Sequence, residues 1–270
     1  MSTSEPPDHP LRRELRRLLI ALGYFTRVPI PAWVGWSAQG LNRAARYFPL
    51  IGVLVGSVAA LVLYAASALW PAALAVPISM AASILLTGAF HEDGLADAAD
   101  GFGGGYDPQR VLALMQDSRI GSYGAIALIL VLLGKFSALL ALAEHGLALA
   151  AAVVVSAHAA SRACALGVMA VLPYVRMEGD AKARPVAEGI GRSDWIIGLV
   201  LGAAPLALVA AMHLMPLRSV LLAILATLAV LVMAARYFRR RISGYTGDCL
   251  GATQQLAELA FYFAACVQLA

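Results

Sequence analysis

Long apolar segments constrain this chain of 270 residues more than any other feature of its sequence. A helix needs roughly 20 mostly apolar residues to cross a bilayer, and hydropathy places its ends only to within a few residues. The segments that meet or approach this length are 48–70, 73–90, 121–143, 147–171, 194–215, 217–235 and 254–270. Segment 217–235 is short, and four polar residues interrupt the last segment, namely Gln254, Gln255, Glu258 and Gln268. About seven transmembrane helices are therefore expected, with six or eight as the alternatives.

The composition agrees with a membrane protein. Hydrophobic residues make up 61% of the chain and charged residues 13%, whereas an ordinary soluble domain is about one quarter charged. The mean hydropathy is +0.78. We therefore predict that residues 1–270 form a single all-α domain, a polytopic integral membrane helical bundle.

The N-terminal region predicts an interfacial helix rather than a cleavable signal. Residues 1–10 are polar and rich in proline, and we expect them to be disordered. Residues 11–30 begin with leucines and arginines at helical spacing, the leucines on one face and the arginines mostly on the other. This pattern is typical of an amphipathic helix lying at the membrane surface.

The basic residues orient the bundle. They cluster before the first span and in the long loops, whereas the short loops carry almost none except Arg218. The positive-inside rule then places the N-terminus and the long loops in the cytoplasm. Every polar motif falls on this face, which favours an enzyme with cytoplasmic substrates over a transporter, whose sites tend to lie near the midplane.

An acidic cluster lies in the first long loop. Asp93, Asp97 and Asp100 are spaced i, i+4, i+7, so a helix would place all three carboxylates on one face. Such a row of like charges needs compensation, and Mg²⁺ is a suitable cation because it takes carboxylate oxygens and often bridges them to phosphate. The adjacent His91 is a candidate ligand for the metal or for phosphate.

The third long loop repeats this theme. Gly244, Asp248 and Gly251 are also spaced i, i+4, i+7. Asp248 is either a further carboxylate of the site or a helix cap, and the glycines would let another helix or a ligand approach closely.

Two cations fall inside predicted spans. An arginine at the bilayer centre costs at least about 2.5–3.5 kcal/mol, so Arg162, next to Ser161, should face a polar cavity or a partner, naturally an acidic site. Lys135 is expected to do the same or to extend toward the membrane surface. His158 lies one turn before Arg162 and would line the same cavity.

Residues 91–101, 117–124 and 244–252, with 25–31, resemble the signature segments of the cobalamin synthase family, the adenosylcobinamide-GDP ribazoletransferases. The segments follow the family's order through nearly the whole chain. Glu92 departs from the pattern, because the family usually has an apolar residue there, and Ser243 stands where a glycine is common. Glu92 would either enlarge the metal site or face water.

The resemblance implies an enzyme of the bacterial cytoplasmic (inner) membrane, with its active site facing the cytoplasm. Such an enzyme transfers the adenosylcobinamide phosphoryl moiety from adenosylcobinamide-GDP to α-ribazole or its 5′-phosphate, with Mg²⁺ as cofactor, and releases GMP. The expected partners are these substrates and the lipid bilayer, without nucleic acid. Spans rich in glycine and alanine leave self-association into a homo-oligomer open.

This chemistry gives a hypothesis for each site residue. Phosphoryl transfer needs charge neutralisation and alignment of the reacting oxygens. Asp93, Asp97 and Asp100 are assigned to the metal, with Asp248 as a further ligand or the general base. Arg119 and Arg162 are assigned to pyrophosphate oxygens. The other residues assigned to substrate binding are His91, Ser161, Gly244, Thr246, Gly247 and Gly251.

Two alternatives stay open at this stage. A membrane phosphotransferase of the CDP-alcohol type also uses motifs rich in Asp and Gly, although its usual Ala-Arg pair is replaced here by Ala98-Ala99 and then Asp100. A cation transporter could coordinate ions with the same acidic face, and it would carry ions without any corrinoid or nucleotide.

Overall fold

The computed structural model describes residues 9–175 and 190–267, so the predicted disorder of residues 1–10 lies almost wholly outside the described residues. The described parts are helical, with one isolated bridge between Tyr174 and Tyr245. The helices are α1 (Pro10–Phe25), α2 (Ala38–Ala44), α3 (Phe48–Ser67), α4 (Ala72–Thr87), α5 (Phe90–Gly104), α6 (Pro108–Met115), α7 (Ser122–His145), α8 (Leu147–Val171), α9 (Arg192–Ala211), α10 (Leu217–Ile242) and α11 (Gly247–Cys266), with 3₁₀ turns η1 (Ala32–Val34) and η2 (Ala45–Tyr47).

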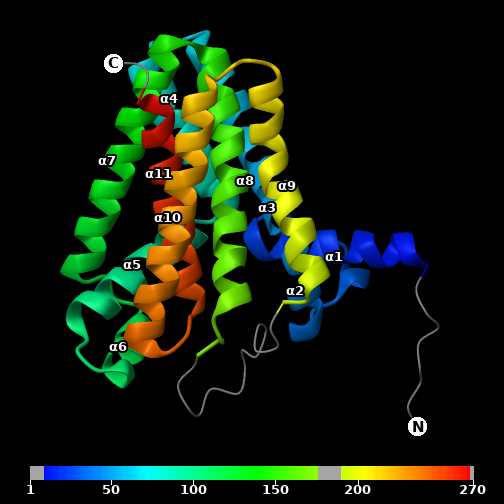
Figure 1. The fold of residues 1–270 in the computed structure, drawn as a ribbon, viewed down its shortest axis with the longest axis vertical. Coiled ribbons are helices and arrows are strands. Elements are labelled where there is room, and N and C mark those ends of the chain that lie inside the picture. The colour runs from blue at the N-terminus through cyan, green and yellow to red at the C-terminus, as the bar shows by residue number, and fades with distance from the viewer. Residues whose placement is uncertain (1–8, 176–189, 268–270) are drawn as a thin grey trace.

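The long helices form a bundle, and the short ones gather toward one of its ends (Figure 1). Helix α8 packs against α3, α7, α9, α10 and α11, so it forms the centre of the bundle. Helices α1, α2, α5 and α6 lie toward the end where α10 finishes and α11 begins. The prediction of an all-α multi-pass membrane bundle is confirmed.

Five helical segments of the described chain are long and apolar enough to cross a membrane. They are Gln39–Ser67, which contains α3, and the helices α7, α8, α9 and α10. Helices α4 and α5 together raise this to as many as six spans. Polar side chains keep α11 out of this set although most of the helix is buried in the bundle, so a count of seven stays a prediction.

A sharp break separates α4 from α5. Gly88 and Ala89 both have left-handed backbone conformations, with φ values of 66° and 58°. The two helices meet at 87°, so α5 leaves the direction of α4 and turns across the bundle. The predicted span 73–90 therefore ends at Thr87, and the acidic segment that follows it is set toward one end of the molecule.

The predicted interfacial segment forms α1, which ends at Phe25 rather than at residue 30. Thr26 has an extended backbone, and its hydroxyl donates to the carbonyl oxygen of Leu22 at 2.7 Å. Leu11 and Leu15 are exposed, whereas Ile20 and Phe25 belong to the core. The helix is therefore anchored to the bundle by its C-terminal half, and its contact with a membrane surface stays a prediction.

Candidate active site

Two glycines bring the acidic segment against the third long loop. A Cβ atom on Gly94 would lie 3.2 Å from the Cα atoms of both Asp248 and Gly251. A Cβ atom on Gly251 would lie 3.1 Å from the Cα atom of Gly94. Helices α5 and α11 therefore touch backbone to backbone, which only glycine permits without a shift. This crossing places Asp248 beside the row of Asp93, Asp97 and Asp100, three residues that do share one helix.

The carboxylates at this crossing disfavour one another's charge. Burial, together with the negative charges of the neighbouring Asp248, Asp93 and Asp100, raises the pKa of Asp97 to about 7. Burial also raises the pKa of Asp248 to about 6, with a smaller contribution from Asp93 and an opposing one from the Thr246 hydroxyl. Because the nearby carboxylates make ionisation of Asp97 and Asp248 harder, a bound cation would stabilise their charged forms.

Asp100 also holds the second loop in place. Its carboxylate accepts hydrogen bonds from the backbone N–H groups of Gly121 at 2.7 Å and Gly124 at 2.9 Å. Gly121 is the N-cap residue of α7 and has no side chain to satisfy the first N–H groups of that helix. Asp100 supplies the cap from another helix, a role that its sequence spacing does not reveal.

The donor set fits Mg²⁺ in type and charge. All four side chains offer carboxylate oxygens, which hard cations prefer. Within residues 9–175 and 190–267, however, no three His, Cys, Asp or Glu side chains lie close enough together to form a ready ligand set. The site therefore has suitable donors on two helices without having a closed metal cage.

The third segment is ordered by Thr246. Its hydroxyl accepts from the backbone N–H of Cys249 and donates to Asp248 Oδ2, both at 3.3 Å. Thr246 is thus the N-cap of α11, and the alternative that Asp248 is the cap is wrong. Gly247 has open space around it. Gly244 is buried, and the backbone of the next residue, Tyr245, accepts a hydrogen bond from Val175 and donates one to Pro173.

Arg119 forms a bidentate pair within its own loop. Its Nε and Nη2 atoms donate to the two carboxylate oxygens of Asp117 at 3.0 and 2.7 Å. The guanidinium holds the pKa of Asp117 down to about 2. The Arg119 side chain is 87% exposed, so a phosphate can reach its remaining N–H groups, or the Nε and Nη2 pair if it replaces Asp117.

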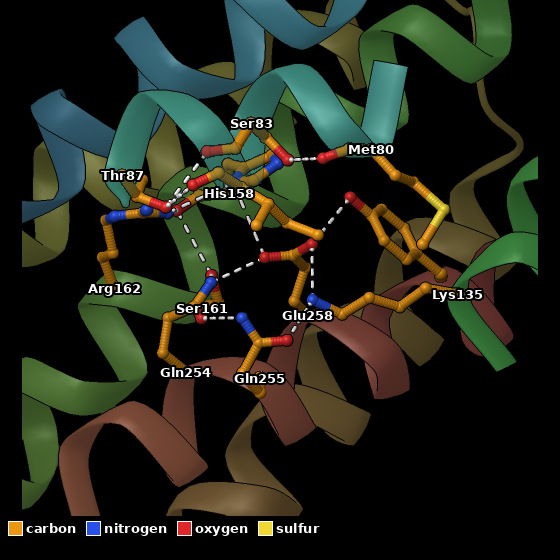
Figure 2. Close-up of polar contacts among 12 residues, drawn as sticks. Met80, Ser83, Thr87, Lys135, His158, Ser161, Arg162, Gln254, Gln255 and Glu258 are labelled. Carbon is orange, nitrogen blue, oxygen red and sulfur yellow. Dashed lines mark hydrogen bonds and ion pairs between the residues drawn. The ribbon is translucent and has the colours of Figure 1, made fainter. Parts of the chain in front are cut away.

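Ser161 and Arg162 lie in a second polar cluster, buried between α7, α8 and α11 (Figure 2). Arg162 Nη1 donates to the carbonyl oxygen of His158 at 3.0 Å, and its Nε atom has no partner. Ser161 Oγ accepts from Gln254 Nε2 at 3.1 Å. The prediction that Arg162 and His158 share one polar environment is confirmed, but the carboxylate in this cluster is Glu258 rather than the acidic row.

Lys135 belongs to the same cluster. Its Nζ atom donates to Glu258 Oε1 at 2.9 Å and to Gln255 Oε1 at 2.6 Å. Lys135 and Glu258 are both about 95% buried, each side chain being 5% exposed. The expectation of a partner inside the bundle is confirmed, and Lys135 does not extend to the surface.

The structure places Glu92 and His91 on the inner side of α5. Gln255 Nε2 donates to Glu92 Oε1 at 2.8 Å, so Glu92 neither enlarges the row of aspartates nor faces bulk water. Both expectations for Glu92 are therefore wrong. His91 is buried and stacks on Phe25 with ring centroids 5.5 Å apart. Because α5 turns about 100° per residue, Glu92 contacts the buried cluster whereas the next residue, Asp93, lies with the other aspartates.

From the sequence, the polar residues of segment 254–270 are expected only to interrupt an apolar span. In the structure Gln254, Gln255 and Glu258, together with Tyr262, form one side of the buried cluster, and Gln268 lies outside the described residues. Their positions i, i+1, i+4 and i+8 repeat at helical spacing within an apolar segment. That spacing is the signal that predicts an inward polar face.

Comparison with known proteins gives a consistent set of relatives. Residues 17–266 match the model of a family described as cobalamin-5-phosphate synthase. A protein of Ralstonia nicotianae named adenosylcobinamide-GDP ribazoletransferase is 52% identical over 250 residues, or 92% of this chain and 94% of the relative. A protein of Shewanella amazonensis with the same name is 47% identical over 258 residues, covering 93% and 95%. No solved structure matches the chain significantly.

Proposed function

Because the chain belongs to the cobalamin-5-phosphate synthase family, it is a transferase of cobalamin biosynthesis, and we propose its substrates and metal as follows. The enzyme transfers the adenosylcobinamide phosphoryl moiety from adenosylcobinamide-GDP to a ribose hydroxyl of α-ribazole or its 5′-phosphate, and GMP leaves. The reaction takes place at the cytoplasmic face of the bacterial inner membrane and depends on Mg²⁺.

The observation that carries this proposal is the crossing of α5 and α11. It places Asp248 beside the row of aspartates on α5, where burial and like charge raise the pKa of both Asp97 and Asp248. Phosphoryl transfer needs positive charge at the phosphates and alignment of the attacking and leaving oxygens. No Lys or Arg in the described part of the chain forms an ion pair with these four carboxylates, and a site of this kind supports a metal-assisted mechanism.

Each aspartate then has a role. Asp93, Asp97 and Asp100 would hold Mg²⁺, which supplies charge neutralisation for the pyrophosphate when it is bound. Asp100 does so while it caps α7, because each carboxylate oxygen keeps a further lone pair. Asp248 is a further ligand or takes the proton of the attacking hydroxyl, and a pKa of about 6 leaves it mostly ionised at pH 7.

Arg119 is more accessible to pyrophosphate than Arg162 is. Arg119 lies in the exposed loop that Asp100 anchors, where its guanidinium can exchange Asp117 for phosphate oxygens. Arg162 lies deeper and lines a small pocket of about 40 Å³ together with Gly247 and Gly251. We assign Arg119 to direct pyrophosphate binding, and contact between Arg162 and pyrophosphate requires this pocket to widen.

The test is turnover of single Asp→Asn variants at the four positions, assayed as GMP release and corrinoid product with saturating Mg²⁺. Loss of a carboxylate that holds the metal should lower kcat at least about 100-fold. Asp107→Asn is the matched control, because Asp107 caps α6 and asparagine is an equally good cap. Near-normal turnover in all four variants would reject the assignment.

The same preparation distinguishes the two alternatives. A phosphotransferase of the CDP-alcohol type would consume a CDP-alcohol in place of adenosylcobinamide-GDP. A cation transporter would move ions into proteoliposomes without corrinoid or nucleotide. Either result in the absence of corrinoid product would replace the proposed reaction.

A further inference from the structure

An apolar groove runs along the outside of the bundle, and none of the four aspartates lines it. Helices α7 and α10 both pack on α11, and the groove lies over α11 between them, with part of α5 at one end. Its volume is about 980 Å³, which is at the upper end for a ligand site in a protein. The groove is therefore large enough for a substantial ligand.

The walls of the groove are almost entirely hydrocarbon. Large apolar side chains that line it are widely exposed in the described structure: Leu130 by 64%, Met233 by 70% and Phe263 by 51%. They come from α7, α10 and α11, respectively. Exposed apolar side chains from three helices thus line the same groove, so an apolar ligand would suit it.

Two arginines that make no hydrogen bond or ion pair in the described structure lie at one end of this groove. Arg236 and Arg240 line the groove at positions i and i+4 of α10, and both are exposed. No hydrogen bond or ion pair found in the described part of the chain involves either guanidinium. Their neighbours Arg239 and Arg241 are engaged, since they donate to the carbonyl oxygens of Val171 and Gly105. The free pair can therefore accept an anionic group.

The length of the groove matches one leaflet of a bilayer. From Val230 to Arg240 the axis of α10 rises about 15 Å, at about 1.5 Å per residue. The hydrocarbon core of a bilayer is roughly 30 Å thick, so one leaflet is about as deep as this groove. Tyr237 lies beside the arginines, as is common for aromatic residues at the level of the lipid headgroups.

We propose that this groove is a binding site for one anionic phospholipid. An acyl chain fills the hollow between α7 and α10, and the lipid phosphate binds Arg236 and Arg240. Anionic lipids are attracted to basic residues near the membrane surface, and guanidinium groups bind phosphate in bidentate fashion. Ala98 and Ala99 of α5 line the same groove between Asp97 and Asp100, so the bound lipid supports the back of the helix that carries the aspartates.

The proposal is tested by native mass spectrometry of the full chain after exchange into vesicles with equal amounts of phosphatidylglycerol and phosphatidylcholine. The wild-type protein should retain one phosphatidylglycerol per chain in mild detergent. The double variant Arg236→Gln with Arg240→Gln should lose retention by about 25-fold, or about fivefold for each arginine. Arg218→Gln is the matched control, because Arg218 is exposed at the opposite end of α10.

A second variant tests the hollow itself. Ala260→Phe should fill the groove from α11 and abolish lipid retention with both arginines present. Equal retention of both lipids by the wild-type protein, or unchanged retention in the arginine variant, would overturn the proposal. So would a wild-type dimer without bound lipid that Ala260→Phe converts to a monomer, because a second copy of the chain would then cover the groove. The arginine variant changes only surface residues, so it decides the question even if Ala260→Phe misfolds.

Discussion

Asp100 is a single residue with two roles, one in the acidic row and one as the cap of α7. Its carboxylate belongs to the acidic row of α5, and it also accepts the first free N–H groups of α7. A cap can be replaced by asparagine at little cost, whereas a metal ligand loses its charge in that change. The two functions of Asp100 can therefore be separated by the choice of substitution.

We expect Asp100→Ala to lower the free energy of unfolding by about 1–2 kcal/mol through loss of the cap, and to lower the thermal midpoint in detergent. Asp100→Asn should keep about half of this stability, because its one amide oxygen still accepts from one N–H group whereas its NH₂ group cannot accept from the other. Thermal unfolding measures the first effect and GMP release the second. Turnover that survives in Asp100→Asn would mean that this residue is a cap and not a metal ligand.

Glu258 offers a second prediction at this scale. It accepts from Lys135, Gln254 and Tyr262 at 2.9, 2.6 and 3.1 Å, all inside the bundle. Removing one partner of a buried ion pair strands the other charge, so Glu258→Gln should cost about 3 kcal/mol or more of stability. The double variant Glu258→Gln with Lys135→Met should recover most of this loss in thermal unfolding. A double variant as unstable as the sum of both single variants would contradict the pairing.

The position of a single side chain could be predicted from the sequence where helical spacing or charge alone determines it. Asp93, Asp97 and Asp100 share a helix face because of their spacing, and Lys135 needed a partner because of its charge. Glu92 was misjudged, because its inward direction depends on which side of α5 packs against α11. The sequence of one helix does not contain that information.

At the scale of elements, the crossing of α5 and α11 controls the site more than either helix does alone. Gly94 and Gly251 remove the side chains that would otherwise hold the two backbones apart. The separation of the aspartates on α5 from Asp248 is therefore set by two positions without functional groups. Substitution of either glycine should therefore reduce turnover more than it reduces the stability of the fold.

Gly94→Ala tests this expectation. The added Cβ atom would lie 3.2 Å from the Cα atom of Asp248, so the helices must separate by a few tenths of an ångström. Since misplacement by about 1 Å can cost about 100-fold in rate, we expect turnover to fall roughly tenfold with little change in thermal midpoint. Gly134→Ala on α7 is the control, because its new Cβ atom meets only the flexible end of Leu259 and Phe263. Equal effects of both changes on turnover would contradict a special role for the crossing.

The element boundaries show what hydropathy can and cannot predict. The apolar segments 121–143 and 147–171 correspond closely to α7 and α8, because uninterrupted apolar sequence extends through both. The segment 73–90 extended past Thr87, since hydropathy does not register the left-handed conformation of Ala89. A non-glycine residue in that conformation is uncommon, and only the packed structure specifies it.

At the scale of the whole molecule, the polar segments that are far apart in sequence gather at one end of the bundle (Figure 1). Helices α5 and α6 and the start of α11 share this end with α1 and α2. The arrangement agrees with the loop charges, which assign all the basic loops to one side of the membrane. The predicted orientation of the protein in the membrane can therefore be tested by labelling one exposed position at each end of the bundle.

Tyr106 and Glu144 are suitable positions for this test. Tyr106 follows α5 and is 97% exposed, and Glu144 is exposed near the end of α7 that lies farthest from Asp100. The native Cys164 and Cys249 are buried, so they should contribute little labelling, and the unmodified chain measures the background from the half-buried Cys266.

We expect Tyr106→Cys to react with a membrane-impermeant maleimide in inverted vesicles and Glu144→Cys to react in right-side-out vesicles. The physical reason is the concentration of arginines on the loops at the Tyr106 end, which resist transfer across the membrane. Labelling is measured by the mass shift of the purified protein, and full labelling in detergent controls for access to each thiol. The reverse pattern would place the acidic row outside the cytoplasm, where a cytoplasmic nucleotide substrate could not reach it.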